Sequence, residues 1–73
     1  MKPDTQQDTA IYLTPREFEV ITQLAQGHSY AQISAQLEIS ENTLKTHIKR
    51  IYRKLNVHNR TQAILATQKL GIL

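Results

Sequence analysis

The sequence predicts an all-α protein built from four short helices. Four serine, threonine or asparagine residues each stand just before a stretch in which apolar side chains recur every three or four residues, as on one face of a helix. No stretch alternates apolar and polar residues, as a half-buried strand would. We therefore expect a four-helix bundle, with helices over residues 15–26, 30–37, 41–54 and 61–70.

The chain is expected to divide into a tail and one domain. Its first ten residues are polar and lack periodicity, so we interpret residues 1–12 as a disordered tail or linker. Residues 13–73 then form a single domain, because 73 residues leave room for only one small core. With one Phe, three Tyr and no Trp, that core should be mainly aliphatic.

The first predicted helix begins at a capping box. Thr14 caps it, Pro15 suits the first helical position because the amide that proline lacks would be unpaired there, and Glu17 reaches back to the cap. Gly27 ends the helix, since glycine adopts the left-handed conformation readily. The apolar residues at helical spacing are Phe18, Ile21, Leu24 and Ala25.

The second and third helices are separated by a tight turn at residues 38–39. Ser29 with Gln32 repeats the capping pattern and starts the second helix. Ser40 caps the third, and Glu41 lies in its first turn, where the helix dipole favours negative charge. The inward residues are Ile33 and Leu37 on the second helix, and Leu44, Ile48, Ile51 and Leu55 on the third.

The fourth helix follows a loop of residues 56–58. Asn59 with Gln62 forms the fourth capping signal, and Gly71 provides the stop. Arg60, near its start, is a candidate partner for Glu17 across the first and fourth helices, although Glu17 is already accounted for as a capping residue.

Charge is strongly segregated along the chain. From residue 42 onward there is no Asp or Glu but seven Lys or Arg, five of them within residues 45–54. Residues 1–41 carry a charge of −4 and residues 42–73 a charge of +7, which together give the net charge of +3. Clustered cations neutralise several phosphates at once, so the pattern indicates a polyanionic partner. The alternative is a solvated helix face with surplus lysine.

The third helix separates its apolar and basic residues. At about 100° per residue, the stripe from Leu44 to Leu55 occupies one side and the polar side chains point the other way. A short helix, a tight turn and then this basic helix form a helix-turn-helix, which places its second helix in the major groove of DNA. The outward residues are Asn42, Lys45, Thr46, Lys49 and Arg53, with Arg50 at their margin.

These outward side chains have the chemistry to read bases. Lysine donates to guanine, asparagine pairs with adenine, and the threonine methyl group meets the methyl group of thymine. Lys45, Thr46, Lys49 and Asn42 are therefore the candidate base-reading residues.

Six segments and Arg60 follow one another in a distinctive order. They are LTPRE (13–17), LAQGHS (24–29), ISAQLEIS (33–40), TLKTHI (43–48), IYRKLNV (51–57) and the closing GIL (71–73). As an ordered set, they resemble the LuxR-type (GerE-type) helix-turn-helix domain of bacterial transcription regulators. The resemblance covers residues 13–73 without an insertion, and it implies a DNA-binding unit with its third helix in the major groove.

The resemblance also implies roles for residues by position. Base reading falls on Lys45, Thr46 and Lys49. Two departures occur: Tyr30 and Ala31 stand where the family commonly has Asn and a basic residue, and Leu44 replaces the usual Val or Ile. The second helix is then expected to hold the DNA backbone less strongly, or through the tyrosine hydroxyl. Together with the outward Arg53, the candidate phosphate contacts are Ser29, Tyr30, Ser40, Thr43 and Arg50.

The fourth helix, which the family often uses for dimerisation, offers small residues for self-association. The candidates recur at intervals of three and four, and the weak homodimer they form should assemble mainly on DNA with two half-sites. They are Ala63, Ala66, Thr67 and Leu70.

The expected function is sequence-specific binding of double-stranded operator DNA, by a transcription regulator or its C-terminal effector domain. RNA polymerase is a further candidate partner. The alternative is a module that binds a protein partner and whose charge only maintains solubility. RNA binding is a less well supported hypothesis, because the sequence shows no aromatic-bearing sheet on which bases could stack. If the tail is a linker, a sensor domain lies upstream; a freestanding regulator is the other possibility.

Other classes of function have little support. Cysteine is absent, and the three histidines lack metal-ligand spacing, so we expect no metal and no cofactor. The sequence contains neither paired carboxylates in a shared apolar context nor a glycine-rich phosphate loop, so we do not expect an enzyme. No apolar run approaches the ~20 residues that span a bilayer, and we expect a cytoplasmic protein that joins the nucleoid when bound.

Overall fold

The computed structural model describes residues 12–71 and contains four α-helices. They are α2 (Pro15–Ala25), α3 (Tyr30–Leu37), α4 (Glu41–Leu55) and α5 (Arg60–Lys69). No strand occurs within residues 12–71, so the predicted all-α class is confirmed, and each predicted helix boundary lies within one residue of the observed one. The predicted tail falls almost wholly outside the described residues, as do the last two residues of the GIL segment.

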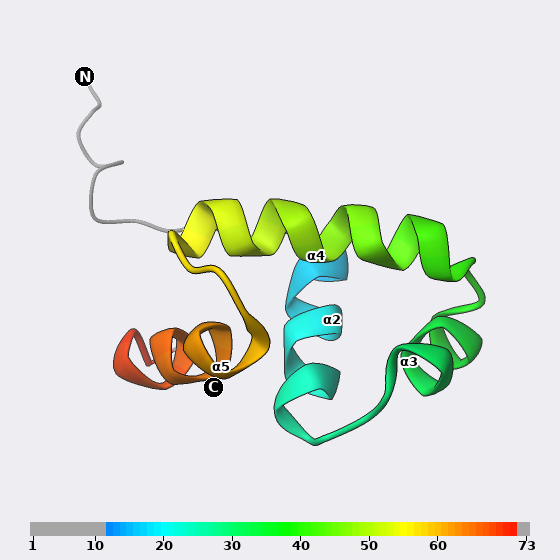
Figure 1. Ribbon diagram of the computed structural model, residues 1–73, viewed down its shortest axis with the longest axis horizontal. Helices are drawn as coiled ribbons and strands as arrows, with labels where there is room; N and C mark the ends of the chain where they lie inside the picture. The colour runs from blue at the N-terminus through cyan, green and yellow to red at the C-terminus, as the bar shows by residue number, and fades with distance from the viewer. Residues whose placement is uncertain (1–11, 72–73) are drawn as a thin grey trace.

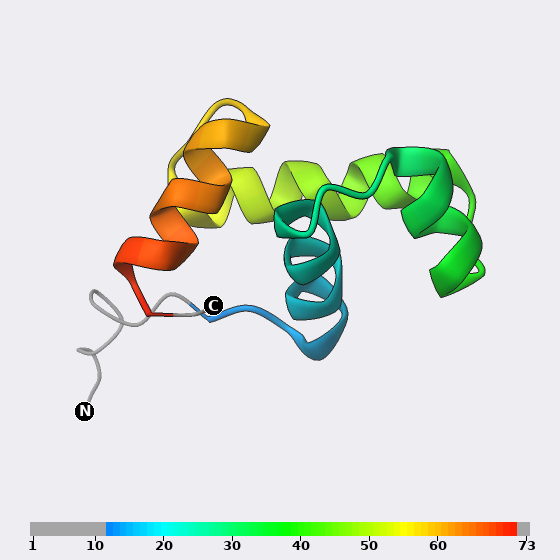
Figure 2. The ribbon, with the colours of Figure 1, turned by 90° about the horizontal axis from the view of Figure 1, so that it is seen from below.

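The longest helix, α4, organises the other three. In Figure 1 it lies across the top of the molecule, and α2, α3 and α5 all lie on one side of it. The view from below in Figure 2 places α3 near the beginning of α4, α5 near its end, and α2 between them. One long side of α4 is therefore packed against the domain and the other is left uncovered.

All four predicted caps are present. The Thr14 hydroxyl accepts from the amide of Glu17 at 3.1 Å, and the Glu17 carboxylate accepts from the amide of Thr14 at 3.0 Å. Ser29 forms the same reciprocal box, and the side chains of Ser40 and Asn59 each accept from the amide three residues on. Local sequence therefore fixes where each helix begins.

Two of the helices end at residues in the left-handed conformation that are not glycine. Glu38 follows α3 with φ 58° and Asn56 follows α4 with φ 57°. Asparagine adopts this conformation more readily than glutamate, so the turn after α3 carries the larger backbone cost. The predicted glycine stop after the first helix is also observed, since Gly27 has φ 91°.

The core is aliphatic, as predicted, and the whole apolar stripe of α4 contributes to it. Its members are Val20, Ile21, Leu24, Ile33, Leu44, Ile48, Ile51, Leu55 and Ala63. Phe18 has the helical spacing of Ile21 and Leu24 but lies outside the core, since this residue is 43% exposed. The buried face of α2 contains Glu17, Val20, Ile21 and Leu24, and Phe18 lies about 100° around the helix from Glu17.

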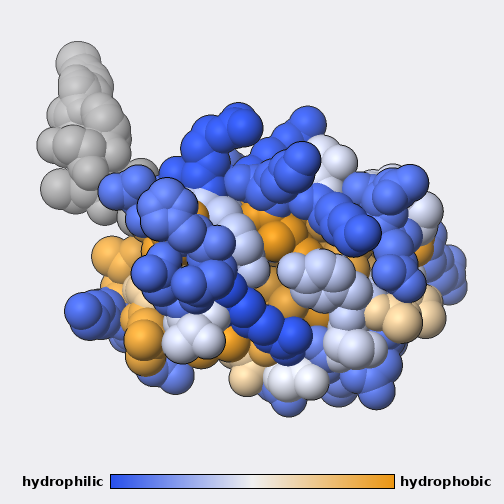
Figure 3. Space-filling view, in the orientation of Figure 1, coloured by the Kyte–Doolittle hydropathy of each residue, from blue (hydrophilic) through white to orange (hydrophobic). Residues whose placement is uncertain are grey.

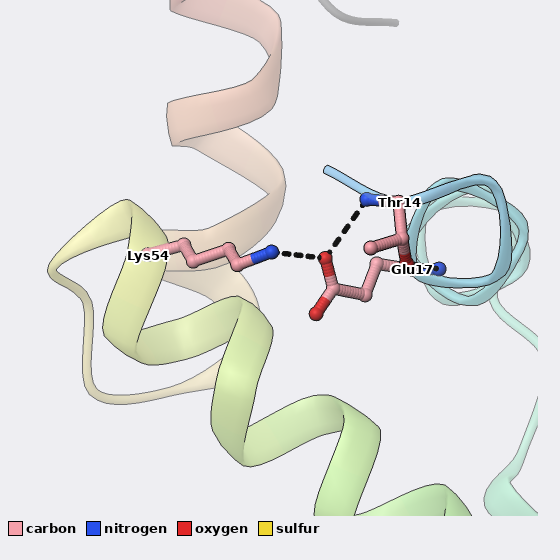
Figure 4. Close-up of polar contacts among 3 residues, drawn as sticks. All are labelled: Thr14, Glu17 and Lys54. Carbon is pink, nitrogen blue, oxygen red and sulfur yellow. Dashed lines mark hydrogen bonds and ion pairs between the residues drawn. The ribbon is translucent and has the colours of Figure 1, made fainter. Parts of the chain in front are cut away.

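An ion pair between a buried carboxylate and a partly exposed lysine joins α2 to the end of α4 (Figure 4). The Glu17 carboxylate is 3% exposed and accepts a hydrogen bond from Nζ of Lys54 at 2.6 Å. Burial by itself would raise the pKa of Glu17, but the hydrogen bonds from Lys54 and Thr14 outweigh burial and leave the pKa below its usual value. One side chain thus completes a helix cap and ties two helices together.

The candidate pair of Glu17 with Arg60 does not form, since Glu17 is paired with Lys54. Arg60 instead donates through Nη2 to the carbonyl oxygens of Leu24 at 2.8 Å and His28 at 2.7 Å. These carbonyls belong to the last turn of α2 and the segment after it. Arg60 therefore links the start of α5 to the end of α2.

Candidate nucleic-acid interface

The candidate base-reading residues lie together on the uncovered side of α4. Asn42, Lys45, Thr46 and Lys49 are all exposed, and each lies one or three positions from the next along a single helix. The Thr46 hydroxyl donates to the carbonyl oxygen of Asn42 at 3.2 Å, which leaves its methyl group as the free part of the side chain. The sequence therefore placed these four residues on the correct side of the helix.

This face is held rigidly and has the dimensions to enter a DNA groove. Four buried side chains of α4 pack into the core, so the helix cannot rotate about its axis without exposing them. Its 15 residues span about 22 Å, and the B-DNA major groove is about 12 Å wide. Figure 3 shows hydrophilic side chains projecting from the edge of the molecule that α4 occupies in Figure 1.

The candidate phosphate contacts gather at two helix N-termini and on the flank of α4. Ser29 and Ser40 are exposed caps, and Thr43 lies beside Ser40, whose hydroxyl donates to the Thr43 hydroxyl at 3.0 Å. Helix N-termini favour anions because their first amides are unpaired and the dipole is positive there. Arg50 and Arg53 are exposed on α4 and supply full positive charges.

Tyr30 occupies a different setting from the other phosphate candidates. It is half-buried and packs against the core together with Tyr52. Burial, and the neighbouring Tyr30 hydroxyl, raise the pKa of Tyr52 to about 12. Tyr52 therefore covers the edge of the core, and only part of Tyr30 is open to an outside partner.

The proposed dimerisation surface needs correction. Ala63 and Thr67 are 0% exposed and belong to the interior of the single domain, while Ala66 is half-buried against the core. The interval of three and four residues thus marked the inward stripe of α5. Leu70 is 49% exposed, and Leu65, which the sequence analysis missed, is 51% exposed. Ala63 and Thr67 therefore contribute to folding, not to a surface.

Two negative observations concern the described part of the chain. Within residues 12–71, no three His, Asp or Glu side chains come together in a way that would hold a metal ion. None of the four helices is long and apolar enough to cross a membrane.

Comparison with known proteins identifies the family. Residues 12–67 match the family described as bacterial regulatory proteins of the luxR family. The chain belongs to the luxR family. As a luxR-family chain with the four-helix fold and a basic α4, it carries the DNA-binding domain of a transcription regulator.

Relatives and solved structures agree with this assignment. The chain is 48% identical over 67 residues to the nitrate/nitrite response regulator protein NarP of Escherichia coli strain K12, covering 90% of this chain and 31% of NarP. It is similar to the response regulator ChrA of a heme-sensing two-component system, with a TM-score of 0.83 and 43% identity over 99% of this chain and 33% of ChrA. It also resembles the transcription factor GerE, with a TM-score of 0.79 and 44% identity over 88% of this chain and 94% of that chain.

This luxR-family chain spans about a third of the length of NarP and of ChrA. By contrast, it matches nearly all of the GerE chain.

Proposed function

We propose that this luxR-family domain reads operator DNA through the outward face of α4 lying in the major groove. Lys45, Thr46, Lys49 and Asn42 contact base edges in this proposal. The observation that carries it is that all four are exposed on one side of a helix whose other side is locked into the core. No acidic residue follows Glu41, so α4 beyond its first turn presents no negative charge that would repel phosphate.

Phosphate contacts position the helix in this proposal. The caps Ser29 and Ser40 and their helix N-termini bind the backbone on either side of the groove, and Arg50 and Arg53 add charge. Tyr30 contributes at most its hydroxyl, because its ring packs against the core. Contacts of this kind set affinity and register, while the base contacts set the sequence preference.

We further propose a weak homodimer that forms mainly on DNA with two half-sites. An open groove of about 380 Å³ runs beside α5 and includes Val57, Leu65 and Lys69. Leu65 in this groove and Leu70 at the end of α5 supply exposed apolar area, but two leucines that are half exposed offer little burial. Each copy therefore relies on DNA to bring the second copy into place.

The wider role proposed is transcription regulation in the bacterial cytoplasm, with RNA polymerase as a partner and with no catalytic step. Relatives three times as long as this chain are named as response regulators, which favours an upstream sensor domain over a freestanding regulator.

The decisive experiment selects binding sites from a randomised duplex library and then measures two double variants against the selected site. Lys45→Ala with Lys49→Ala should abolish the preference for that site, since two base-reading side chains are lost. Lys45→Arg with Lys49→Arg is the matched control for charge. It should keep nonspecific affinity and alter the preference, because a guanidinium fork cannot reproduce the geometry of a lysine ammonium.

An alanine double variant that retains the wild-type site preference would contradict base reading by α4. A wild-type domain that selects no sequence and binds DNA without salt dependence would favour the protein-interaction module instead.

A further inference from the structure

An open depression lies at the C-terminal end of α4, and the sequence analysis assigned it no role. It has a volume of about 440 Å³, and its wall is made by the last two turns of α4 and the loop that leads to α5. The lining residues are Lys49, Tyr52, Arg53, Asn56, Val57 and His58.

The loop side of this depression is held in place by backbone hydrogen bonds. The amide of Asn56 donates to the carbonyl of Arg53 at 3.2 Å, and the amide of Val57 donates to that of Tyr52 at 3.0 Å. The amide of His58 donates to Oε1 of Gln62 at 2.9 Å. The polar side chains of Asn56 and His58 are exposed, so the loop presents them from a fixed backbone.

The charged side chains that line the depression are cations, and they offset the negative end of the α4 dipole. Lys49 and Arg53 line it from α4, and His58 adds an imidazole that donates a hydrogen bond in either protonation state. The acidic Glu17 pairs with Lys54, which lies about 140° around the helix from Lys49. No acidic side chain lines the depression.

The position of the depression relative to DNA follows from the proposed base-reading residues of α4. Asn56 lies about 10 Å beyond Lys49 along the helix axis, at about 1.5 Å per residue. If residues 45–49 reach the base edges, the last turn of α4 and the loop after it lie beside the rim of a groove about 12 Å wide, where the phosphates lie. The depression therefore meets the DNA backbone next to the bases that α4 reads.

We propose that this depression is a seat for one DNA backbone phosphate, with Arg53 supplying charge and the side chains of Asn56 and His58 supplying hydrogen bonds. This inference rests on the proposed DNA-binding function. It assigns to the loop after α4 a contact that extends the footprint of the domain by one phosphate beyond the contacts at the helix N-termini.

The test changes the charge of the loop at its exposed histidine. His58→Lys adds one cation at the seat, and counterion release predicts that the log–log salt slope steepens by about 0.9. That slope corresponds to an affinity gain of about eightfold at 0.1 M salt, falling to about twofold at 0.5 M. His58→Glu should weaken binding in the same salt-dependent way.

Gln26→Lys and Gln26→Glu are the matched controls. Gln26 is exposed and lines a groove with Phe18 on the face of α2 opposite the core, so the same charge changes occur there away from α4. These two variants should shift affinity less than twofold. Melting curves of all four variants establish that each one is folded.

The outcomes separate the seat from the function on which it rests. If the wild type binds DNA but the His58 variants follow the Gln26 variants, the seat is wrong and DNA binding stands. If the wild type binds no DNA, both are overturned. A titration with inorganic phosphate alone, at constant ionic strength, completes the test. Saturable amide shifts at residues 56–58 would show a site for free phosphate and overturn its assignment to the DNA backbone.

Discussion

The Glu17 side chain performs two tasks that a single substitution can separate. Glu17→Gln keeps an oxygen that accepts from the Thr14 amide, since glutamine also closes a capping box, but it removes the negative charge facing Lys54. Glu17→Ala removes both the cap and the ion pair. Comparing the two variants therefore measures the charge and the cap independently.

The expected magnitudes follow from burial. A hydrogen bond between charged groups contributes about 1.5–3 kcal/mol, but the Lys54 side chain is 35% exposed, so solvent screening reduces this to about 1 kcal/mol for Glu17→Gln. Loss of the cap adds about 1 kcal/mol in Glu17→Ala. At about 4–8 °C per kcal/mol for a domain of this size, the melting temperature should fall by about 6 °C and about 12 °C respectively.

Differential scanning calorimetry at pH 7 measures both changes, and Glu19→Gln is the matched control. Glu19 is on the same helix and pairs with Arg16 at 3.4 Å, but both side chains are exposed, so its loss should cost less than about 0.5 kcal/mol. A Glu17→Gln variant that melts together with Glu19→Gln would refute the reasoning that burial makes the Lys54 pair important.

The pH dependence has a definite sign. The pKa of Glu17 is lowered in the folded state from its ordinary value of 4.5, so the unfolded chain binds this proton more readily than the folded one. The stabilisation is present above pH 4.5 and is lost as pH falls through the folded pKa. The difference in melting temperature between wild type and Glu17→Gln should therefore shrink below pH 4.5, and a difference that stays constant down to pH 3 would contradict this assignment.

Two further predictions concern the α5 end of the domain. Arg60→Lys should lower the free energy of unfolding by about 1–2 kcal/mol in urea titrations, because the lysine side chain is shorter and its ammonium group cannot take the position from which Nη2 donates to both carbonyls. An unchanged midpoint would show that these contacts are dispensable. Leu65→Lys should reduce cooperative binding to DNA with two half-sites, and it should change the affinity for a single half-site by less than about twofold. Gel-shift titrations measure both affinities, and equal losses on both duplexes would argue against the α5 contact.

Local signals in the sequence were sufficient for most of the fold. Each helix begins at a side-chain cap that lies three residues from the amide it satisfies, and such short-range pairs are visible in the sequence. The strongly amphipathic α4 also revealed its inward and outward faces directly, because it has one unbroken apolar stripe and a wholly polar opposite side.

Periodicity failed where apolar and polar residues share both faces. On α5, the small residues Ala63 and Thr67 have the spacing of a surface stripe and of a core stripe alike, and only the position of α2 and α4 decides that they are buried. On α2, the buried face includes the charged Glu17 and excludes the apolar Phe18. A rule based on hydrophobicity alone would bury Phe18 and expose Glu17. The partner of Glu17 lies 37 residues away in sequence, a separation over which no local pattern chooses between Lys54 and Arg60.

The same long-range contacts limit how much positive charge is available to DNA. Of the seven cations after residue 41, Lys54 is paired with Glu17 and Arg60 is bound to backbone carbonyls. Lys69 lies on α5, beside the groove that includes Leu65. Four cations therefore remain on the exposed surface of α4. Each phosphate neutralised contributes about −0.9 to the log–log slope of affinity against salt, so these four limit the slope for one domain to about −3.6. A slope of this size supports only modest affinity for a single half-site, which is why specific regulation by this domain should require two copies on one operator. The four cations are Lys45, Lys49, Arg50 and Arg53.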